Sequence, residues 1–122
     1  MTEQTARQWL AALAQTWQAQ DAAAMANLFT DDATAQSDPY KTPVRGRDNL
    51  RKGFAWWMQD QRDVQIVIGH IDVIGERFYA EIDSSWSVPS TGGKIRERGL
   101  LVCDLDGDCV KNMREFWKTR TE

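Results

Sequence analysis

The sequence has few of the residues from which metal sites and membrane spans are built. Its 122 residues include one histidine, two cysteines and three prolines. One histidine and no Cys-x-x-Cys pair leave too few nitrogen and sulfur ligands for a typical zinc site, so we expect no metal. The longest apolar runs span about four residues, whereas a membrane-spanning helix needs roughly 20. No basic start followed by an apolar run marks a secretory leader, so we expect a protein without a membrane partner.

The two cysteines also lack the geometry of a disulfide. Cys103 and Cys109 flank a predicted tight turn at Asp106-Gly107, and in such a hairpin their sulfur atoms lie on opposite faces. We therefore predict two free thiols and a cytoplasmic location. The formal net charge is −3, which argues against nucleic acid as the main partner.

Tryptophan, by contrast, is abundant for so short a chain. Six indoles indicate either a very aromatic core or an aromatic-lined cavity, and composition alone leaves both alternatives open. They are Trp9, Trp17, Trp56, Trp57, Trp86 and Trp117.

Hydrophobic periodicity predicts helices first and strands last. No repeat or linker interrupts the chain, so we expect one domain over residues 1–122. The expected helices span residues 3–20, 22–29 and 48–61, and the expected strands span residues 33–37, 64–74, 78–88, 95–105 and 110–119. Helices followed by a meandering antiparallel sheet are typical of an α+β fold.

The faces of the late strands predict a charged cluster. With Asp106-Gly107 as the turn, Arg98 lies opposite Glu115 and Leu100 opposite Met113. If the 89–93 connection also brings Asp83 near Arg98, one face gathers four charged side chains. They are Glu81, Asp83, Arg98 and Glu115.

This charged face has two interpretations. It can be the solvent face, with the apolar residues of the opposite side packed on the helices, namely Phe78, Ile82, Trp86, Leu101 and Phe116. It can instead be a polar cluster inside an aromatic cavity, where desolvation raises the pKa of a carboxyl and Arg98 lowers it.

Several sequence blocks resemble the nuclear transport factor 2-like superfamily, in its SnoaL-like (polyketide cyclase-like) branch. They are Trp17 with Gln20-Asp21, the run Leu-Phe-Thr-Asp-Asp-Ala at 28–33, Gly46-Arg47, Gln61 with Asp63-Val64, and Arg-Glu-Phe-Trp at 114–117. The resemblance implies a cone-shaped fold, in which three helices pack on a strongly bent, mostly antiparallel sheet. It also implies a pocket at the wide end with Met113, Glu115 and Trp117 in it.

The resemblance further implies a homodimer through the outer face of the sheet, to which Ile82, Trp86, Leu101 and Phe116 would contribute. Specific relatives suggest different chemistry. Asp38 matches the base of ketosteroid isomerases, but Leu13 and either Leu100 or Leu101 stand where those enzymes have oxyanion donors. Epoxide hydrolase-like enzymes use two acids and an arginine, for which Glu115, Glu81 or Asp83, and Arg98 are the counterparts.

We therefore expect a pocket that binds a small, largely apolar molecule without a cofactor. Its predicted lining is Trp17, Phe54, Trp57, Tyr79, Met113 and Trp117, with Asp38 as a further ligand-binding candidate. Glu115 or Asp83 would act as general base, with Glu81 and Arg98 orienting a polar group, in an isomerase, cyclase, dehydratase or hydrolase reaction. The alternative is a non-catalytic, dimerising binding module.

Overall fold

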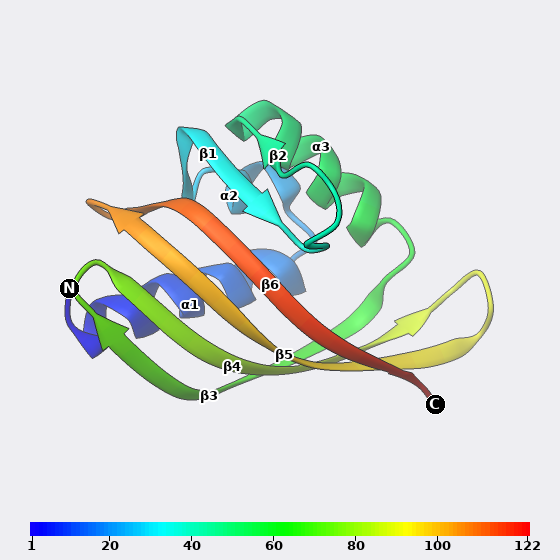
Figure 1. Cartoon of the computed structure of the whole chain (residues 1–122). Helices are drawn as coiled ribbons and strands as arrows, with labels where there is room; N and C mark the ends of the chain where they lie inside the picture. The colour runs from blue at the N-terminus through cyan, green and yellow to red at the C-terminus, as the bar shows by residue number, and fades with distance from the viewer.

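Three helices lie against one face of a six-stranded sheet (Figure 1) in the computed structural model, which describes residues 1–122. The α+β class is confirmed. The helices are α1 (Glu3–Gln18), α2 (Ala22–Ala26) and α3 (Arg47–Met58), and the strands are β1 (Phe29–Gln36), β2 (Val44–Arg45), β3 (Arg62–Ile74), β4 (Arg77–Val88), β5 (Gly93–Asp106) and β6 (Cys109–Thr121). None of the helices has the length and hydropathy of a membrane span.

Side-chain caps begin the first two helices. The Thr2 hydroxyl accepts a hydrogen bond from the Thr5 amide at 3.1 Å, and Asp21 Oδ1 accepts one from the Ala24 amide at 3.0 Å. Helix α2 ends at Ala26, earlier than predicted, because Phe29 already begins β1. The chain therefore turns from helix to sheet within two residues.

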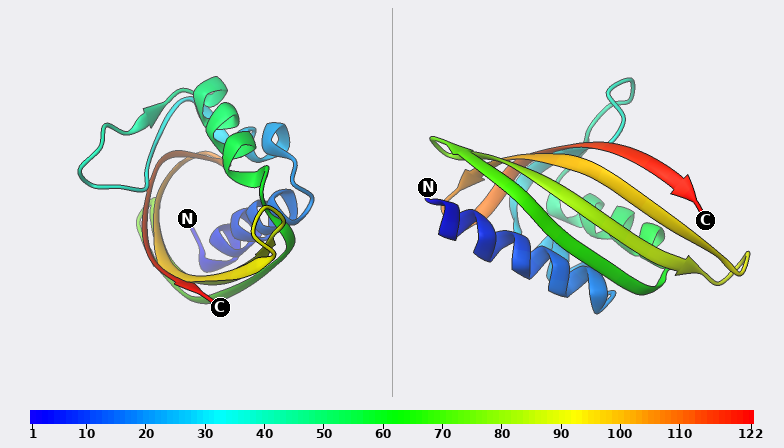
Figure 2. Two further views of the ribbon diagram at one scale, coloured as in Figure 1. Left: turned by 90° about the vertical axis from the view of Figure 1, so that its right-hand side faces the viewer. Right: turned by 90° about the horizontal axis from the view of Figure 1, so that it is seen from below.

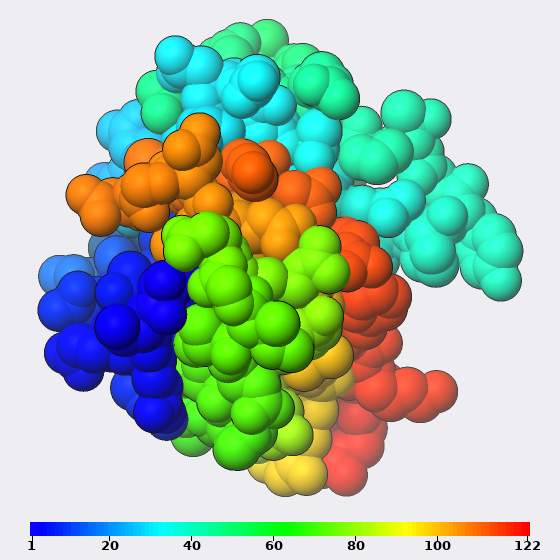
Figure 3. All heavy atoms as spheres, turned by 60° about the vertical axis from the view of Figure 1, so that its left-hand side comes forward, coloured from blue at the N-terminus to red at the C-terminus, as the bar shows by residue number.

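The sheet is ordered β2-β1-β6-β5-β4-β3. Strands β3 to β6 form an antiparallel meander as predicted, while β1 runs parallel to β6. Figure 2 shows the long strands bending around α1, so the sheet has a concave face toward the helices and a convex face away from them. The segment between β1 and β2 projects from the body of the molecule (Figure 3).

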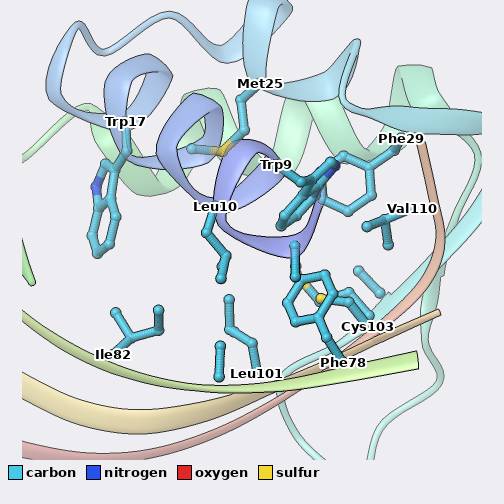
Figure 4. Packing of buried hydrophobic residues seen from close by; sticks show 14 of the residues in the cluster. Trp9, Leu10, Trp17, Met25, Phe29, Phe78, Ile82, Leu101, Cys103 and Val110 are labelled. Carbon is cyan, nitrogen blue, oxygen red and sulfur yellow. The ribbon is translucent and has the colours of Figure 1, made fainter. Parts of the chain in front are cut away.

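The hydrophobic core lies between α1 and the concave face. Leu10 and Trp17 of α1 lie over Leu101 of β5 and Ile82 of β4 (Figure 4), and all four are buried. Trp9 of the same helix packs against Phe29 and Phe78. Along β4 every even-numbered residue from Phe78 to Trp86 is buried, which is the alternation of a strand with one face in the core.

The register between β5 and β6 differs from the predicted one. The turn residues are Gly107 and Asp108, and Gly107 has φ 63°, which its missing side chain allows. Beyond the turn, Leu105 pairs with Val110 but Asp104 pairs with Asn112, so Lys111 is an extra residue in β6. A shift by one residue turns every following side chain to the other face. Glu115 therefore pairs with Leu101 and shares its concave face.

The indole of Trp117 lies against Gly99 of the neighbouring strand β5. Gly99 pairs with Trp117, and a Cβ atom on Gly99 would overlap with indole carbons of Trp117 and with the carbonyl oxygen of Phe116. Only glycine lets the indole lie this close to β5. The position of Trp117 on the concave face thus depends on a missing side chain in the neighbouring strand.

Replacing Gly99 by alanine should destabilise the protein by about 1–3 kcal/mol, because the indole and the strand must move apart. The matched control is Gly53→Ala in α3, where a Cβ atom meets nothing within 4 Å and a gain of about 0.5–1 kcal/mol is expected. Urea unfolding measures both. An unchanged midpoint for Gly99→Ala would contradict the packing described here.

Candidate functional site

A cavity of about 510 Å³ opens between the helices and the concave face of the sheet. Twenty residues line it, 16 of them hydrophobic, so a ligand would move from water into mostly apolar surroundings. The lining comes from all parts of the fold: Leu13, Ala14 and Trp17 of α1, Met25 of α2, Ala35 of β1 and the following Ser37, Val44 of β2, Leu50, Gly53, Phe54, Trp56 and Trp57 of α3, Ile66 and Ile68 of β3, Ile82 of β4, Glu97 and Leu101 of β5, and Met113, Glu115 and Trp117 of β6.

Hydrogen bonds hold Trp17 at the inner wall of this cavity. Its indole N–H donates to Gln61 Oε1 at 2.7 Å, and both side chains are buried. Gln20, two residues after the end of the same helix, donates to the backbone oxygens of Met58 at 2.9 Å and Gln61 at 2.6 Å. The end of α1 is therefore tied to the segment that leads from α3 into β3.

Three indoles pack together beside the cavity. The ring centroid of Trp17 lies 4.6 Å from that of Trp57 and 5.8 Å from that of Trp86, and Trp57 and Trp86 are 5.9 Å apart, nearly perpendicular. Tilted and edge-to-face arrangements at these distances are favourable for aromatic rings. The cluster makes one side of the cavity rigid and aromatic.

Glu115 is one of two acidic side chains that lie among these apolar groups. Its backbone pairs with Leu101, and its Oε1 accepts a hydrogen bond from the indole N–H of Trp117 at 3.2 Å. It has no salt bridge, since the arginines of β5 point to the opposite face. The carboxyl group thus faces the cavity with one neutral hydrogen-bond donor.

Burial raises the pKa of the Glu115 carboxyl to about 7, from an ordinary value of 4.5. The cause is the removal of the charged form from water, to which repulsion by Glu97 adds, while the hydrogen bond from Trp117 acts in the opposite direction. A carboxyl with this pKa is present in both protonation forms near neutral pH.

Glu97 is a cavity residue that the sequence reasoning missed. It lies on β5 two residues before Gly99, on the same side as Leu101, and accepts a hydrogen bond from the Thr119 hydroxyl. Ser84 lies opposite it on β4, and its buried hydroxyl has no hydrogen-bond partner. The sequence signal for Glu97 is its place as the acidic residue in an otherwise uncharged alternating row of β5 that continues to Leu101 and Cys103.

Comparison with known proteins identifies the family. The sequence pattern of the SnoaL-like domain matches residues 6–112. The chain belongs to the SnoaL-like domain family. No curated protein matches the SnoaL-like chain.

Solved structures share the fold of this SnoaL-like protein at low sequence identity. A Catenulispora acidiphila protein with a ketosteroid isomerase-like fold, in complex with trimethylamine, has TM-score 0.79 and 15% identity, covering 88% of this chain and 83% of its own. The protein Rv0760c of Mycobacterium tuberculosis has TM-score 0.84 and 13% identity over 100% and 99% of the two chains. The epoxide hydrolase/cyclase-like enzyme SalBIII, of pyran ring formation in the polyether salinomycin, has TM-score 0.82 and 21% identity over 95% and 92%.

Six of the predicted site residues lie together in the cavity of this SnoaL-like fold. They are Trp17, Phe54, Trp57, Met113, Glu115 and Trp117. Asp38 and Tyr79 are not among the lining residues. Asp38 Oδ1 instead accepts the Tyr40 amide at 2.9 Å in the projecting segment, and Tyr79 pairs with Val102 on the convex side.

The predicted cluster of Glu81, Asp83 and Arg98 with Glu115 is not formed. The first three lie on the convex face, where Asp83 binds Arg96 at 2.7 Å and Arg98 at 3.3 Å. The predicted proximity of Asp83 and Arg98 is confirmed, but Glu115 lies on the other face because of the extra residue Lys111. The Arg96 guanidinium holds the pKa of Asp83 below its usual value, so this carboxyl is a poor base.

The apolar residues predicted for the outer face are also mostly on the concave side. Ile82, Trp86 and Leu101 are buried against the helices, as expected if the charged row faces solvent. Of this set, only Phe116 is exposed on the convex face.

Trp56, 72% exposed, lies at the mouth of the cavity. His70 is exposed, and its Nε2 lies 3.0 Å from Oδ1 of Asp72.

The raised pKa predicts how stability changes with pH. The folded protein holds the Glu115 proton more tightly than the unfolded chain, so its contribution is present below pH 4.5 and is lost as pH rises to about 7. Relative to Glu115→Gln, the wild type should lose about 2–3 kcal/mol between pH 4.5 and pH 8.

Urea unfolding at a series of pH values measures this difference. Glu115→Met also lacks the titrating group, so its difference from the wild type should change with pH in the same way. A difference that stays constant from pH 4.5 to pH 8 for both variants would contradict a raised pKa at Glu115.

Proposed function

We propose that this SnoaL-like protein binds a small, largely apolar molecule in its cavity and transfers a proton to or from it through Glu115. The observation that carries the proposal is a single carboxyl with a raised pKa, facing an aromatic cavity of about 510 Å³. Carboxyl groups whose pKa approaches the working pH are efficient proton donors and acceptors.

Proton transfer by one carboxyl suits cofactor-free reactions. In its charged form, Glu115 would accept a proton from a carbon next to a carbonyl group and return it to another carbon, which is an isomerisation. In its neutral form, it would protonate a departing or ring oxygen, as dehydration, epoxide opening and cyclisation require. Burial by Trp17, Phe54 and Trp57 would keep bulk water from competing for the proton.

The cavity lining supports proton transfer by one carboxyl better than it supports an epoxide hydrolase-like or a ketosteroid isomerase-like mechanism. An epoxide hydrolase-like set of two acids and an arginine is not assembled, because Arg98 lies on the convex face with Asp83. The ketosteroid isomerase-like assignment of Asp38 lacks support, since Asp38 does not line the cavity. Glu115 is thus the favoured base of the two that the sequence suggested.

The fold neighbours support a small-molecule ligand. One holds trimethylamine and another takes part in pyran ring formation, as epoxide hydrolase/cyclase-like enzyme. At these identities the comparison extends to the fold alone, so the ligand of this chain has to be found by experiment.

A panel of epoxides, enones and polyketide-like ketones tests the proposal. Wild-type protein should turn over at least one compound, and Glu115→Gln should lower kcat by about 100-fold or more because the proton acceptor is lost. Glu81→Gln, an exposed change on the convex face, should keep wild-type activity.

Two results would contradict this proposal. Turnover that survives Glu115→Gln would remove Glu115 from the chemistry. Quenching of tryptophan fluorescence by the same compounds, without turnover of any of them, would favour the alternative of a non-catalytic binding module.

We also keep the proposal of a homodimer through the convex face. Phe116, Val67 and Ile74, 45%, 65% and 67% exposed, are large apolar side chains on this face. The cytoplasmic location stays a prediction, supported by the free thiols of Cys103 and Cys109.

Sedimentation equilibrium tests the dimer. The wild type should sediment as a dimer and Phe116→Arg as a monomer, because the charge would be buried in the interface. Tyr40→Arg, in the projecting segment, is the control that should stay dimeric. A wild type that is monomeric at all concentrations would overturn the proposal.

A further inference from the structure

The cavity carries charge of only one sign. Among its 20 lining residues the ionisable side chains are Glu97 and Glu115, and no lysine, arginine or histidine is present. The nearest arginines of β5, Arg96 and Arg98, point to the convex face and are paired with Asp83. An anionic ligand would therefore meet repulsion and no compensating positive charge.

Two of the aromatic side chains in the lining already use their indole N–H groups within the protein. The indole N–H of Trp17 is used by Gln61, and that of Trp117 by Glu115. Trp56, Trp57 and Phe54 complete the aromatic part of the lining. The face of an indole carries negative potential and attracts a cation, most strongly where water is excluded.

Acidic side chains and aromatic faces thus agree on one class of ligand. We infer that the molecule bound in this cavity carries an organic cation, such as a substituted ammonium group, on an otherwise apolar body. The inference rests on the proposed function of the same cavity and names the class of its substrate. Glu97 would hold the cationic group by charge, while Glu115 would exchange protons with the atoms next to it.

The two carboxyl groups differ in their hydrogen bonds, which explains why they would have different roles. Glu97 is fixed by the hydroxyl of Thr119 on the neighbouring strand, whereas Glu115 has only the indole N–H of Trp117. A cation between them would compensate the charge that burial makes costly at Glu115. A neutral, purely apolar ligand would leave that charge uncompensated.

Three probes of nearly the same shape separate charge from size. Benzyltrimethylammonium is a cation, neopentylbenzene is its neutral isostere, and phenylmethanesulfonate has a tetrahedral anionic head. Binding is measured by tryptophan fluorescence and calorimetry at pH 8. The cation should bind about 10-fold more tightly than the neutral isostere, and the anion should not bind.

Matched variants locate the charge effect. Glu97→Gln and Glu115→Gln should each weaken binding of the cation by about 5- to 10-fold and leave the neutral isostere within about 2-fold. Glu81→Gln on the convex face should change neither. Circular dichroism and the urea midpoint check that each variant is folded.

The affinity for the cation should also depend on pH. The probe itself does not titrate, so a change between pH 5.5 and pH 8 reports on the protein. Glu97 and Cys103 of β5 are the titratable groups beside Glu115, and the other elements that line the cavity place only uncharged side chains there. Affinity should rise with pH as Glu115 loses its proton, and this rise should vanish in Glu115→Gln.

The outcomes separate this inference from the function on which it rests. If the neutral isostere binds as tightly as the cation, or if neither glutamate variant weakens the cation, the inference is overturned and the apolar pocket stands. If no probe binds at all, both the inference and the proposed ligand-binding cavity fail.

Discussion

The pairing of β5 with β6 is the constraint on which the rest of the site depends. One extra residue, Lys111, shifts the register between Asp104 and Leu105, and all side chains beyond it change face. Without the shift, Glu115 and Trp117 would lie on the convex face among arginines, and the concave face would receive Phe116. With it, Trp117 lies across Gly99 and donates its N–H to Glu115.

A carboxyl in this position is kept at a cost to stability. Packing of Trp17, Trp57 and Trp86 and the hydrogen bond from Trp17 to Gln61 hold the cavity wall in place, so the fold tolerates one poorly solvated acid. The same burial that destabilises the charged form moves the pKa of Glu115 to about 7. The proton transfer proposed for Glu115 would thus depend on the same burial that lowers stability, an opposition common at functional sites.

Much of the fold was predictable because it depends on local periodicity. The stripe of Trp9, Leu10 and Trp17 and the alternation of β4 each specify one buried face. The pairing of Asp83 with Arg98 was expected only if the 89–93 connection brings the two together, and the observed register does so. The face of β6 was not predictable in this way, since the extra residue is a backbone event without a side-chain pattern of its own.

The site was predictable in part for the same reason. The resemblance to a known family pointed to Met113, Glu115 and Trp117 independently of any register, and these residues do line the cavity. Glu81, Asp83 and Arg98 were added from the register and lie outside. Glu97 was not predictable in this way, because its charged neighbours Arg96 and Arg98 indicate that the polar face of β5 is the opposite one.

Glu115 is a half-buried carboxyl poised between its two protonation forms near neutral pH. Carbon-13 NMR of the glutamate side-chain carboxyls, followed from pH 3 to pH 9 and assigned by comparison with Glu115→Gln, measures this directly. The resonance lost in the variant should titrate with a midpoint near 7. A midpoint near 4.5, the ordinary glutamate value, would contradict it.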